Sequence, residues 1–241
     1  RRVALTSAGR EYAARVRHHL EQLEKDTLGL ISRSGIGRSL HIAVLPTLAT
    51  LWLVPRLAGF QREFGDIAVS LSVRTLPFQF SDHPFDAAIY HASELWPQTQ
   101  GFRLFDEGGL IPVCSPVLQG DNAAHLTGLT HLHMSSRPDA WRQWYEAQGL
   151  PYQPSVNAGP RYELFSMTLA AVHAGIGVAL CPEFLVRDDL ESGALVQPVA
   201  GCLSVREAYF FSYPIVSQPS EALLSFEAWL KRVAGAGNAP V

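Results

Sequence analysis

The fold is decided by residues 40–50, which read LHIAVLPTLAT. The first six are almost all apolar and predict a buried strand, and the Pro-Thr pair after them predicts a turn into a helix. We expect that helix over Leu51–Phe64, where Leu53 and Phe60 lie on one face. Pro55 lies inside this helix and either kinks it or marks its first turn.

Further strand-like runs follow at intervals that suit a parallel β-α-β series. The expected strands are residues 67–73, 85–90, 102–105, 110–114 and 207–213, and residues 220–233 are expected to form a closing helix. Gly108-Gly109 separates two of these strands, and the aromatic-rich run at 207–213 is a second candidate crossing. Two crossing strands predict a hinge between two lobes.

Length and composition allow two modest cores in this chain of 241 residues, of which 47% are hydrophobic. The formal net charge of −3 argues against a surface that coats nucleic acid. Cys114, Cys181 and Cys202 are odd in number and far apart, which argues against a disulfide framework and a zinc site. Because we find no signal peptide and no uncharged apolar run of roughly 18 residues, we expect a cytoplasmic protein without a membrane partner.

The chain opens with RRVALTSAG, residues 1–9, and continues as a charged amphipathic stretch. Arg1 and Arg2 carry charge that attracts phosphate, and Thr6 or Ser7 can accept a backbone N–H as a helix cap. Residues at alternating steps of three and four then form a heptad seam, which predicts dimerisation through the helix of a second subunit. The seam consists of Ala13, Val16, Leu20, Leu23, Thr27 and Leu30. The alternative is that this stripe docks on the chain's own globular body.

Residues 1–9 resemble the end of the DNA-binding domain of LysR-type transcription regulators, where a basic wing ending in Leu-Thr-x-Ala-Gly leads into a dimerising linker helix. Later stretches resemble the effector-binding domain of the same family, in the same order. They are residues 42–44, 52–57, 60 and 85–89, followed by 140–144, 170–182 and 193–196. The second set is most similar to the branch of glycine-cleavage activators and β-lactamase regulators. Because a recognition helix is missing, this chain is not expected to read DNA bases by itself.

The resemblance implies an α/β fold of two Rossmann-like lobes joined by crossing strands. This fold is similar to type 2 periplasmic binding proteins, and a long dimerisation helix precedes it. Residues 1–6 would be a remnant of the wing and residues 7–34 the linker helix. Residues 39–115 and 213–235 are expected to form the first effector-binding lobe, and residues 116–212 the second.

The function that this resemblance implies is DNA-binding control of transcription. A small-molecule effector is expected in the cleft between the lobes, and the oligomer would pass its state to the DNA-binding heads. The expected partners are operator DNA, bound by the full-length protein only, the effector, and further copies of the chain in a homodimer or homotetramer. RNA polymerase is a plausible further partner, and no cofactor, metal or catalytic residue is implied.

Candidate effector contacts are residues that follow strands, because ligands of open parallel sheets bind beyond the carboxyl ends of the strands. Thr47 is the first choice, since its hydroxyl lies at the start of a helix and suits a carboxylate or another small anion. His91 and Arg137 can pair with an anionic effector, and Phe165 can supply an apolar wall. The full set is Thr47, Leu48, Thr50, Thr75, Tyr90, His91, Ser135, Ser136, Arg137 and Phe165.

Several of these residues also have an ordinary structural explanation. Thr47 and Thr50 are favoured at helix caps whatever the function of the protein. Phe165 suits a hydrophobic core, and His91 suits a solvated loop. Trp96 lies either near the mouth of the cleft or in a subunit interface. The sequence leaves these alternatives open.

An enzyme and a solute-binding protein are the alternative functions for a two-lobed α/β chain. Residues 175–178, Gly-Ile-Gly-Val, lack the third glycine of a dinucleotide fingerprint and are expected to end a helix and begin a strand. The sequence contains no nucleophile elbow, phosphate-loop signature or zinc-protease helix. A solute-binding protein would ordinarily carry a signal peptide in place of a charged heptad helix. His131 and His133 can place two imidazoles on one strand face, but a clear third metal ligand is missing.

Overall fold

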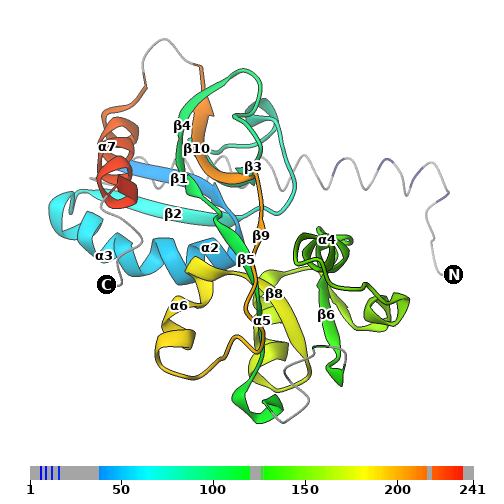
Figure 1. The fold of residues 1–241 in the computed structure, drawn as a ribbon. Coiled ribbons are helices and arrows are strands. Elements are labelled where there is room, and N and C mark those ends of the chain that lie inside the picture. Colours follow the sequence, from blue (N-terminus) through cyan, green and yellow to red (C-terminus); the bar gives the residue numbers. More distant parts are fainter. Residues whose placement is uncertain are drawn as a thin grey trace, which may run out of the picture.

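The computed structural model describes residues 38–119, 126, 128–215 and 219–235, together with Thr6, Gly9, Tyr12 and Val16. The main part forms two lobes, one above the other in Figure 1, and each lobe contains a five-stranded sheet. Helices flank both sheets. The predicted two-lobed α/β fold is therefore confirmed.

The first sheet has the strand order β2-β1-β3-β10-β4. Its strands are β1 (Arg38–Val44), β2 (Ile67–Val73), β3 (Ala87–Ala92), β4 (Thr99–Asp106) and β10 (Ala208–Pro214). Strand β1 pairs in parallel with β2 and β3, whereas β10 runs antiparallel to β3 and β4. The predicted parallel β-α-β series is therefore present, and β2 coincides with the strand predicted at residues 67–73.

The helix after β1 begins five residues before the predicted start at Leu51. It runs as α2 (Pro46–Leu48), a π-helical turn (Ala49–Leu53) and α3 (Val54–Glu63). Pro46 lies in the first turn, where its missing backbone N–H is tolerated, so the residue that we interpreted as part of a turn starts the helix. Pro55 follows directly after the wide π-helical turn, at the second position of α3, where it donates no backbone hydrogen bond.

Neighbouring residues of β1 face opposite sides of the first sheet, as the two-residue period of a strand requires. Ile42 and Val44 belong to the core that the sheet shares with α3 and α7 (Glu221–Gly235). Ala43 belongs to a smaller cluster on the other side, together with Tyr90 and Phe210. The aromatic rings Phe78, Phe80 and Trp96 pack against this smaller cluster from the loops after β2 and β3.

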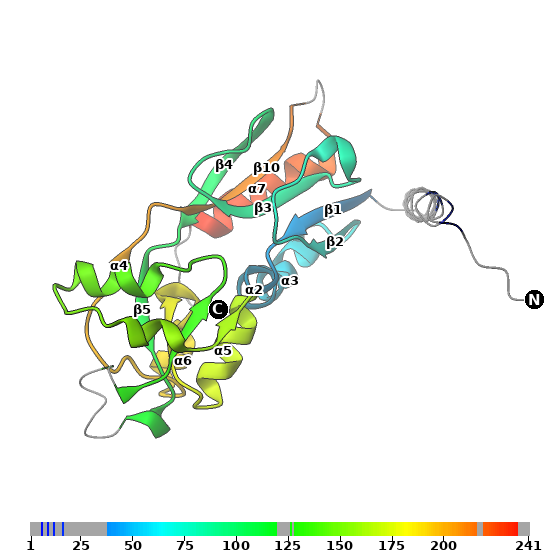
Figure 2. The ribbon, with the colours of Figure 1, turned by 90° about the vertical axis from the view of Figure 1, so that its right-hand side faces the viewer.

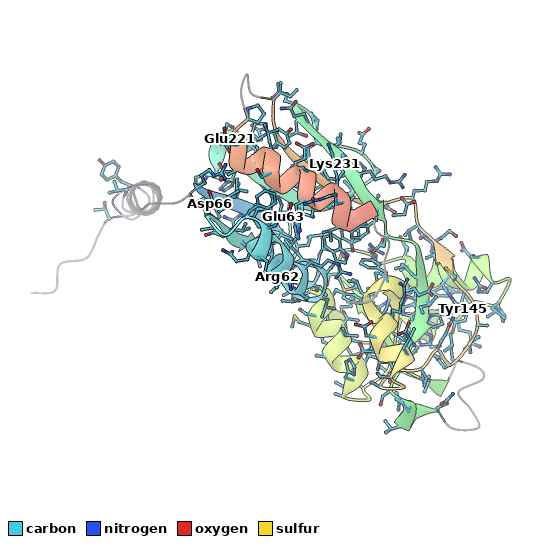
Figure 3. All side chains as sticks on the ribbon, turned by 90° about the vertical axis from the view of Figure 1, so that its left-hand side faces the viewer. Arg62, Glu63, Asp66, Tyr145, Glu221 and Lys231 are labelled. Atoms are coloured by element: carbon cyan, nitrogen blue, oxygen red, sulfur yellow. The ribbon has the colours of Figure 1, made fainter. Side chains whose placement is uncertain are left out.

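Ion pairs join α7 to the rest of the first lobe. Arg232 contacts Glu63 of α3 at 2.7 Å, and Arg38 contacts Asp66 at 2.8 Å and Glu221 at 3.1 Å. Figure 3 shows Glu63, Asp66 and Glu221 along the side of the lobe that α3 and α7 form. These five side chains are between 41% and 87% exposed. Each pair therefore contributes about 0–1 kcal/mol at most.

The second sheet has the strand order β7-β6-β8-β5-β9. Its strands are β5 (Gly109–Val113), β6 (His131–Met134), β7 (Arg161–Tyr162), β8 (Val178–Pro182) and β9 (Leu203–Ser204). The helices of this lobe are α4 (Ala140–Ala147), α5 (Phe165–His173) and α6 (Glu183–Glu191), and short 3-10 helices lie at Phe80–Asp82, Pro116–Leu118 and Pro154–Ala158. Residues of α4 contribute to one core of the sheet, and residues of α5 and α6 contribute to a second core. Gly175, with φ 71°, lies between α5 and β8, as predicted.

Two crossing segments join the lobes. The chain crosses at Glu107-Gly108 after β4 and returns at residues 205–207 after β9. The Glu107 backbone N–H donates to the Glu207 carbonyl at 3.4 Å, so the crossings lie side by side. Gly108 has φ 80°, in the left-handed region that favours glycine.

Both crossings come before the lobe boundaries that we expected at 115/116 and 212/213. Gly109–Val113 pairs with β8 and β9 in the second sheet, although we assigned these residues to the first lobe. Residues 208–212 pair with β3 in the first sheet, although we assigned them to the second lobe. The difference arises because strand pairing, rather than a break in composition, determines where the chain changes sheet.

Before Arg38 the structure describes four residues. Thr6 Oγ1 accepts a hydrogen bond from the Gly9 backbone N–H at 3.1 Å, as predicted for a helix cap, and Gly9, Tyr12 and Val16 are helical. The remaining residues of the predicted wing and seam lie outside the described residues: Arg1, Arg2, Ala13, Leu20, Leu23, Thr27 and Leu30. Among the described residues, no helix combines the length and the apolar character that crossing a membrane requires.

Candidate functional site

The candidate residues belong to segments that meet where the two lobes face each other. Helix α2 follows β1 of the first lobe and contacts α5 of the second, and Figure 2 shows the two helices next to each other. Arg137, in the loop after β6, reaches across to His91 of β3 and to Glu107 in the first crossing. Ligands of open α/β sheets bind at such edges. The junction between the lobes is therefore the candidate site.

Thr47 is buried at this junction, and its hydroxyl makes no hydrogen bond to a described residue. The residue is 6% exposed, and its Oγ1 has no hydrogen-bond partner among the described residues. The N-cap of the helix is Leu45, which makes no side-chain cap, and Thr50 Oγ1 donates to the carbonyls of Pro46 and Thr47, both at 3.2 Å. Neither threonine therefore caps the helix. A buried hydroxyl without a partner costs about 1–3 kcal/mol, which a ligand can recover.

Leu48 points to a different role from the one that we predicted. It is 1% exposed and belongs to the large core of the first lobe, with Trp52 and Leu53. Such a side chain has almost no surface left for a ligand. The helical period explains the error, since adjacent residues at the start of a helix face different directions.

Three of the predicted residues line one small pocket at the carboxyl edge of the first sheet. Thr75, Tyr90 and His91 share it with Arg74 and with the aromatic rings of Phe78 and Trp96. The pocket has a volume of about 40 Å³. Since a water molecule needs about 10–15 Å³ on this scale, the pocket has room for a few waters or one small chemical group.

Tyr90 is held rigidly at this pocket. Its hydroxyl accepts a hydrogen bond from the Trp96 backbone N–H at 2.8 Å, and its ring stacks on the Trp96 ring with centroids 3.8 Å apart. Trp96 therefore lies at the edge of the pocket, packed on its own lobe. Sequence reasoning missed Arg74 and Phe78, although both lie close to Thr75 in the loop after β2.

The most important residue that the sequence did not reveal is Glu107. Its side chain is 1% exposed, and both carboxylate oxygens accept hydrogen bonds from Arg137 Nη2 at 2.7 Å. His91 Nε2 lies 2.9 Å from the same carboxylate. An ionised carboxylate can only accept, so Nε2 of His91 carries the hydrogen. We predicted that His91 and Arg137 pair with an anionic effector, but in this structure their anionic partner is Glu107.

The surroundings of Glu107 keep it charged. Burial raises the pKa of this carboxyl, but the hydrogen bond from His91 and the charge of Arg137 outweigh burial and hold the pKa below its ordinary value. Tyr209, whose ring lies 5.1 Å from that of His91, has a raised pKa because of burial and the nearby Glu107 charge. Glu107 is thus an ionised group in an apolar setting. The only signal for it in the sequence is one acidic residue directly before a glycine pair.

The remaining predicted residues are less closely joined to this group. Ser135 and Ser136 are exposed in the turn after β6, where the Ser135 backbone N–H donates to the Tyr162 carbonyl at 2.8 Å. Phe165 is the first residue of α5 and packs, half-buried, against a core of the second lobe. This placement favours the core role that the sequence left open for Phe165.

His131 and His133 are buried and paired with protein groups. His131 Nδ1 donates to the Leu129 carbonyl at 3.0 Å, and its Nε2 accepts from the Tyr145 hydroxyl at 3.0 Å. His133 Nε2 donates to the Val156 carbonyl at 2.9 Å. Burial lowers the pKa of His131 to about 4, so the ring is neutral at pH 7. Within the parts of the chain described, no three potential metal-binding side chains form a cluster.

Comparisons with known proteins agree with the fold. Residues 33–235 match the family model described as the LysR substrate binding domain. The chain is 31% identical over 249 aligned positions to the glycine cleavage system transcriptional activator of Escherichia coli strain K12, and the alignment covers 98% of this chain and 78% of that protein.

Two solved structures of effector domains are also similar. The effector domain of the transcriptional regulator AmpR of Pseudomonas aeruginosa has a TM-score of 0.71 at 27% identity, covering 83% of this chain and 96% of that chain. The AmpR effector binding domain from Citrobacter freundii has a TM-score of 0.72 at 25% identity, covering 83% of this chain and all 100% of that chain. Since the family model spans most of the sequence, and the fold and a full-length relative agree with it, this chain belongs to the family of LysR-type transcriptional regulators.

Proposed function

We propose that this chain is the sensing and assembly part of a DNA-binding regulator, which binds a small-molecule effector at the junction between the two lobes. The observation that carries this proposal is Thr47. Its hydroxyl is buried at the start of a helix that contacts the opposite lobe, and it has no partner among the described residues. Buried polar groups in folded proteins are almost always paired. Because Trp144 Nε1 and Ser212 Oγ are also buried without a partner among the described residues, the proposal rests on the unpaired Thr47 hydroxyl together with the contact between α2 and α5.

Residues that follow the strands of both lobes suit an effector with a small polar or anionic group. Thr75, Tyr90 and His91 offer hydrogen-bonding groups at the pocket on the carboxyl edge of the first sheet, and Ser135 and Ser136 are exposed in the second lobe. Arg74 adds a cation to the same pocket. A carboxylate is a suitable partner for such a set of donors. Phe165 has a smaller role in this proposal, as part of the wall behind α2.

The effector would act by shifting the populations of lobe arrangements. In the described part of the chain the backbone passes between the lobes at two adjacent crossings, so a ligand that contacts both lobes favours one arrangement over another. The linker helix predicted for residues 7–34 would pass this change to paired DNA-binding domains, with Val16, Leu20, Leu23, Thr27 and Leu30 as its predicted seam. Arg1 and Arg2 would lie at the edge of those domains, against DNA phosphates.

We infer the partners of the whole protein from its family. They are operator DNA, further copies of the chain in a homodimer or homotetramer, and RNA polymerase, in a cytoplasmic setting. The name of the Escherichia coli relative, a transcriptional activator, supports the contact with RNA polymerase. The relatives are transcriptional regulators, and we propose binding rather than catalysis as the role of the junction.

Thermal unfolding against a panel of compounds tests the proposal, because a ligand of the native state raises the apparent stability. The panel contains amino acids, small carboxylates, aromatic acids and cell-wall fragments. We expect a saturable rise in Tm with at least one compound. The rise should disappear in Thr47→Ala and persist in Thr130→Ala, which removes the same atoms from an exposed residue of the second lobe outside the candidate set. A response that survives Thr47→Ala would contradict the assignment of the site.

A further inference from the structure

Glu107 connects the two lobes through its side chain as well as through the backbone. The carboxylate lies in the first crossing, His91 belongs to β3 of the first lobe, and Arg137 belongs to the loop between β6 and α4 of the second lobe. The contact of Arg137 with Glu107 is therefore an ion pair between a hinge segment and the opposite lobe. It measures 2.7 Å to each carboxylate oxygen.

The two partners differ in their freedom to move. Glu107 is held by its backbone hydrogen bond to Glu207, by the left-handed Gly108 that follows it, and by burial of a side chain that is 1% exposed. Arg137 is 26% exposed and lies in a loop. If the pair separates, Arg137 is the partner that leaves.

Arg137 also has N–H donors that make no hydrogen bond to a described residue. Both hydrogen bonds to Glu107 come from Nη2, and neither Nη1 nor Nε makes a hydrogen bond to any described residue. A guanidinium has five N–H donors in a planar fork that matches a carboxylate. A second anion can therefore approach the same guanidinium, and it would compete with Glu107 for it.

The pair is better explained by a switch than by stability. Removing two charges from water offsets much of their attraction, so a buried ion pair is weak support for stability and is better attested as a device that fixes one arrangement. A second contact between the lobes is purely aromatic. Phe184 of α6 packs against Phe105 and Tyr209, with centroids 5.3 Å and 5.5 Å apart. This contact does not depend on charge.

We infer that Glu107 is an internal competitor of the effector: it occupies the anion-binding groups of Arg137 and His91 and so fastens the lobes, until an external carboxylate takes Arg137 and releases them. The inference rests on the proposed function, because it assumes that the junction receives a small ligand. It assigns the effector a chemical class, a compound with a free carboxylate. It also makes Glu107 a specificity-determining residue, since only a competing anion can replace it.

The fastening is tested without any effector, by pulsed electron paramagnetic resonance between spin labels at Glu94→Cys and Gln143→Cys. Both positions are exposed, one in each lobe, and Cys202→Ser removes the exposed native thiol. Labelled chains are diluted with unlabelled chains, so that distances within one chain dominate. We expect the distance distribution to widen or shift in Glu107→Gln and in Arg137→Met. Arg232→Met is the matched control, because it removes an ion pair of the same 2.7 Å length within the first lobe, and it should change nothing.

The competition is tested with acetate, and with acetamide as a neutral probe of the same shape, at constant ionic strength. We expect acetate to raise the Tm of Glu107→Gln at lower concentrations than it does for the unchanged protein, because Arg137 is then free. The double variant Glu107→Gln with Arg137→Met should lose this response, and acetamide should have no effect on any of the proteins.

Two results overturn the inference. One is an unchanged distance distribution in both Glu107→Gln and Arg137→Met. The other is the same response to acetate with and without the Glu107 charge, including no response in either protein. Failure of the proposed function looks different, because no compound of the effector panel would then raise the Tm, while the distance measurement would still report on the ion pair.

Discussion

A cluster around His131 in the second lobe and the junction between the lobes both bury polar side chains, but they use the hydrogen-bonding groups differently. In the cluster, both ring nitrogens of His131 are paired, and the Trp141 indole N–H donates to the Leu132 carbonyl at 2.9 Å. The neighbouring Trp144 indole N–H is buried without a partner among the described residues, so full pairing belongs to this cluster and not to the whole lobe. At the junction, the Thr47 hydroxyl has no partner among the described residues, and Arg137 Nη2 donates its hydrogen bonds to Glu107, a residue outside its own lobe.

The difference separates two uses of buried polarity. A polar group whose hydrogen bonds are all made within one lobe loses hydrogen bonds when that lobe rearranges. Such a group therefore contributes to stability and to a unique packing. A group that is unpaired, or that is shared between two bodies, gains from a new partner and can change its partner when the bodies move. On this basis we assign a structural role to the His131 cluster, formed by His131, Trp141 and Tyr145, and we propose the binding role for the junction.

The largest effect is expected from Trp141→Ala in the His131 cluster. The Trp141 side chain is 2% exposed and packs edge-on against His131, with ring centroids 4.4 Å apart. Its removal leaves a cavity and breaks the hydrogen bond to the Leu132 carbonyl. We expect the free energy of unfolding to fall by about 3–5 kcal/mol. Urea unfolding followed by far-ultraviolet circular dichroism measures this loss. A loss below 1 kcal/mol would mean that the cluster is not the rigid unit described.

Above pH 4.5, the largest single pH-dependent contribution to stability should come from His131. Burial also lowers the pKa values of His41 and His133, which contribute in the same direction. Burial lowers the pKa of His131 from 6.5 to about 4. The unfolded chain therefore takes up a proton that the folded protein refuses, so the stability is complete above pH 6.5 and is lost as the pH falls toward 4, by about 3 kcal/mol. Unfolding in urea at pH 7 and pH 5 checks this.

A variant separates this effect from that of the junction. His131→Gln should reduce the difference between pH 7 and pH 5, and His41 and His133 should account for the part that remains. The pKa of Glu107 is also lowered, so its contribution is present above about pH 4.5 and lost only below that value. A pH dependence that is unchanged in His131→Gln would assign the effect to another group.

A smaller loss is expected from Arg137→Met at the junction. Glu107 would keep His91 as a partner but would lose the Arg137 guanidinium. Removing one member of a fully buried pair costs about 3–5 kcal/mol, and the partial exposure of Arg137 reduces our expectation to about 2 kcal/mol. Arg232→Met, at an exposed pair, should cost less than about 1 kcal/mol. Equal losses in the two variants would remove the distinction between the junction and an ordinary surface pair.

The smallest effects are expected to have opposite signs in the two regions. Tyr145→Phe removes the hydroxyl that donates a hydrogen bond to His131 Nε2, and it should lower the free energy of unfolding by about 1 kcal/mol. Thr47→Val keeps the shape of the side chain but removes an unpaired buried hydroxyl, so it should raise stability by up to about 1 kcal/mol. The same Thr47→Val variant should lose its response to the effector. Destabilisation by Thr47→Val would indicate that the hydroxyl already has a partner.

The secondary structure was predictable because it depends on local spacing. The apolar run at 40–45 predicted β1, and residues 67–73 were predicted as the strand that the structure contains. The start of the first helix was misplaced because Pro46 suits both a turn and a first helical turn, and only the backbone that follows distinguishes them. Thr47 could be proposed from the sequence because it closely follows the strand β1. That position is a property of the chain and does not depend on how the side chains pack around it.

What the sequence determined by itself is the order of strands and helices, the division into two lobes and the family, because periodicity, turns and motif order are properties of the chain. Tertiary structure alone decided the partners. Glu107 is separated in the sequence from His91 by 16 residues and from Arg137 by 30 residues. The three side chains meet only because two crossings bring both lobes to one hinge. The pKa of Glu107 then depends on its burial and on these two partners, which no local pattern encodes.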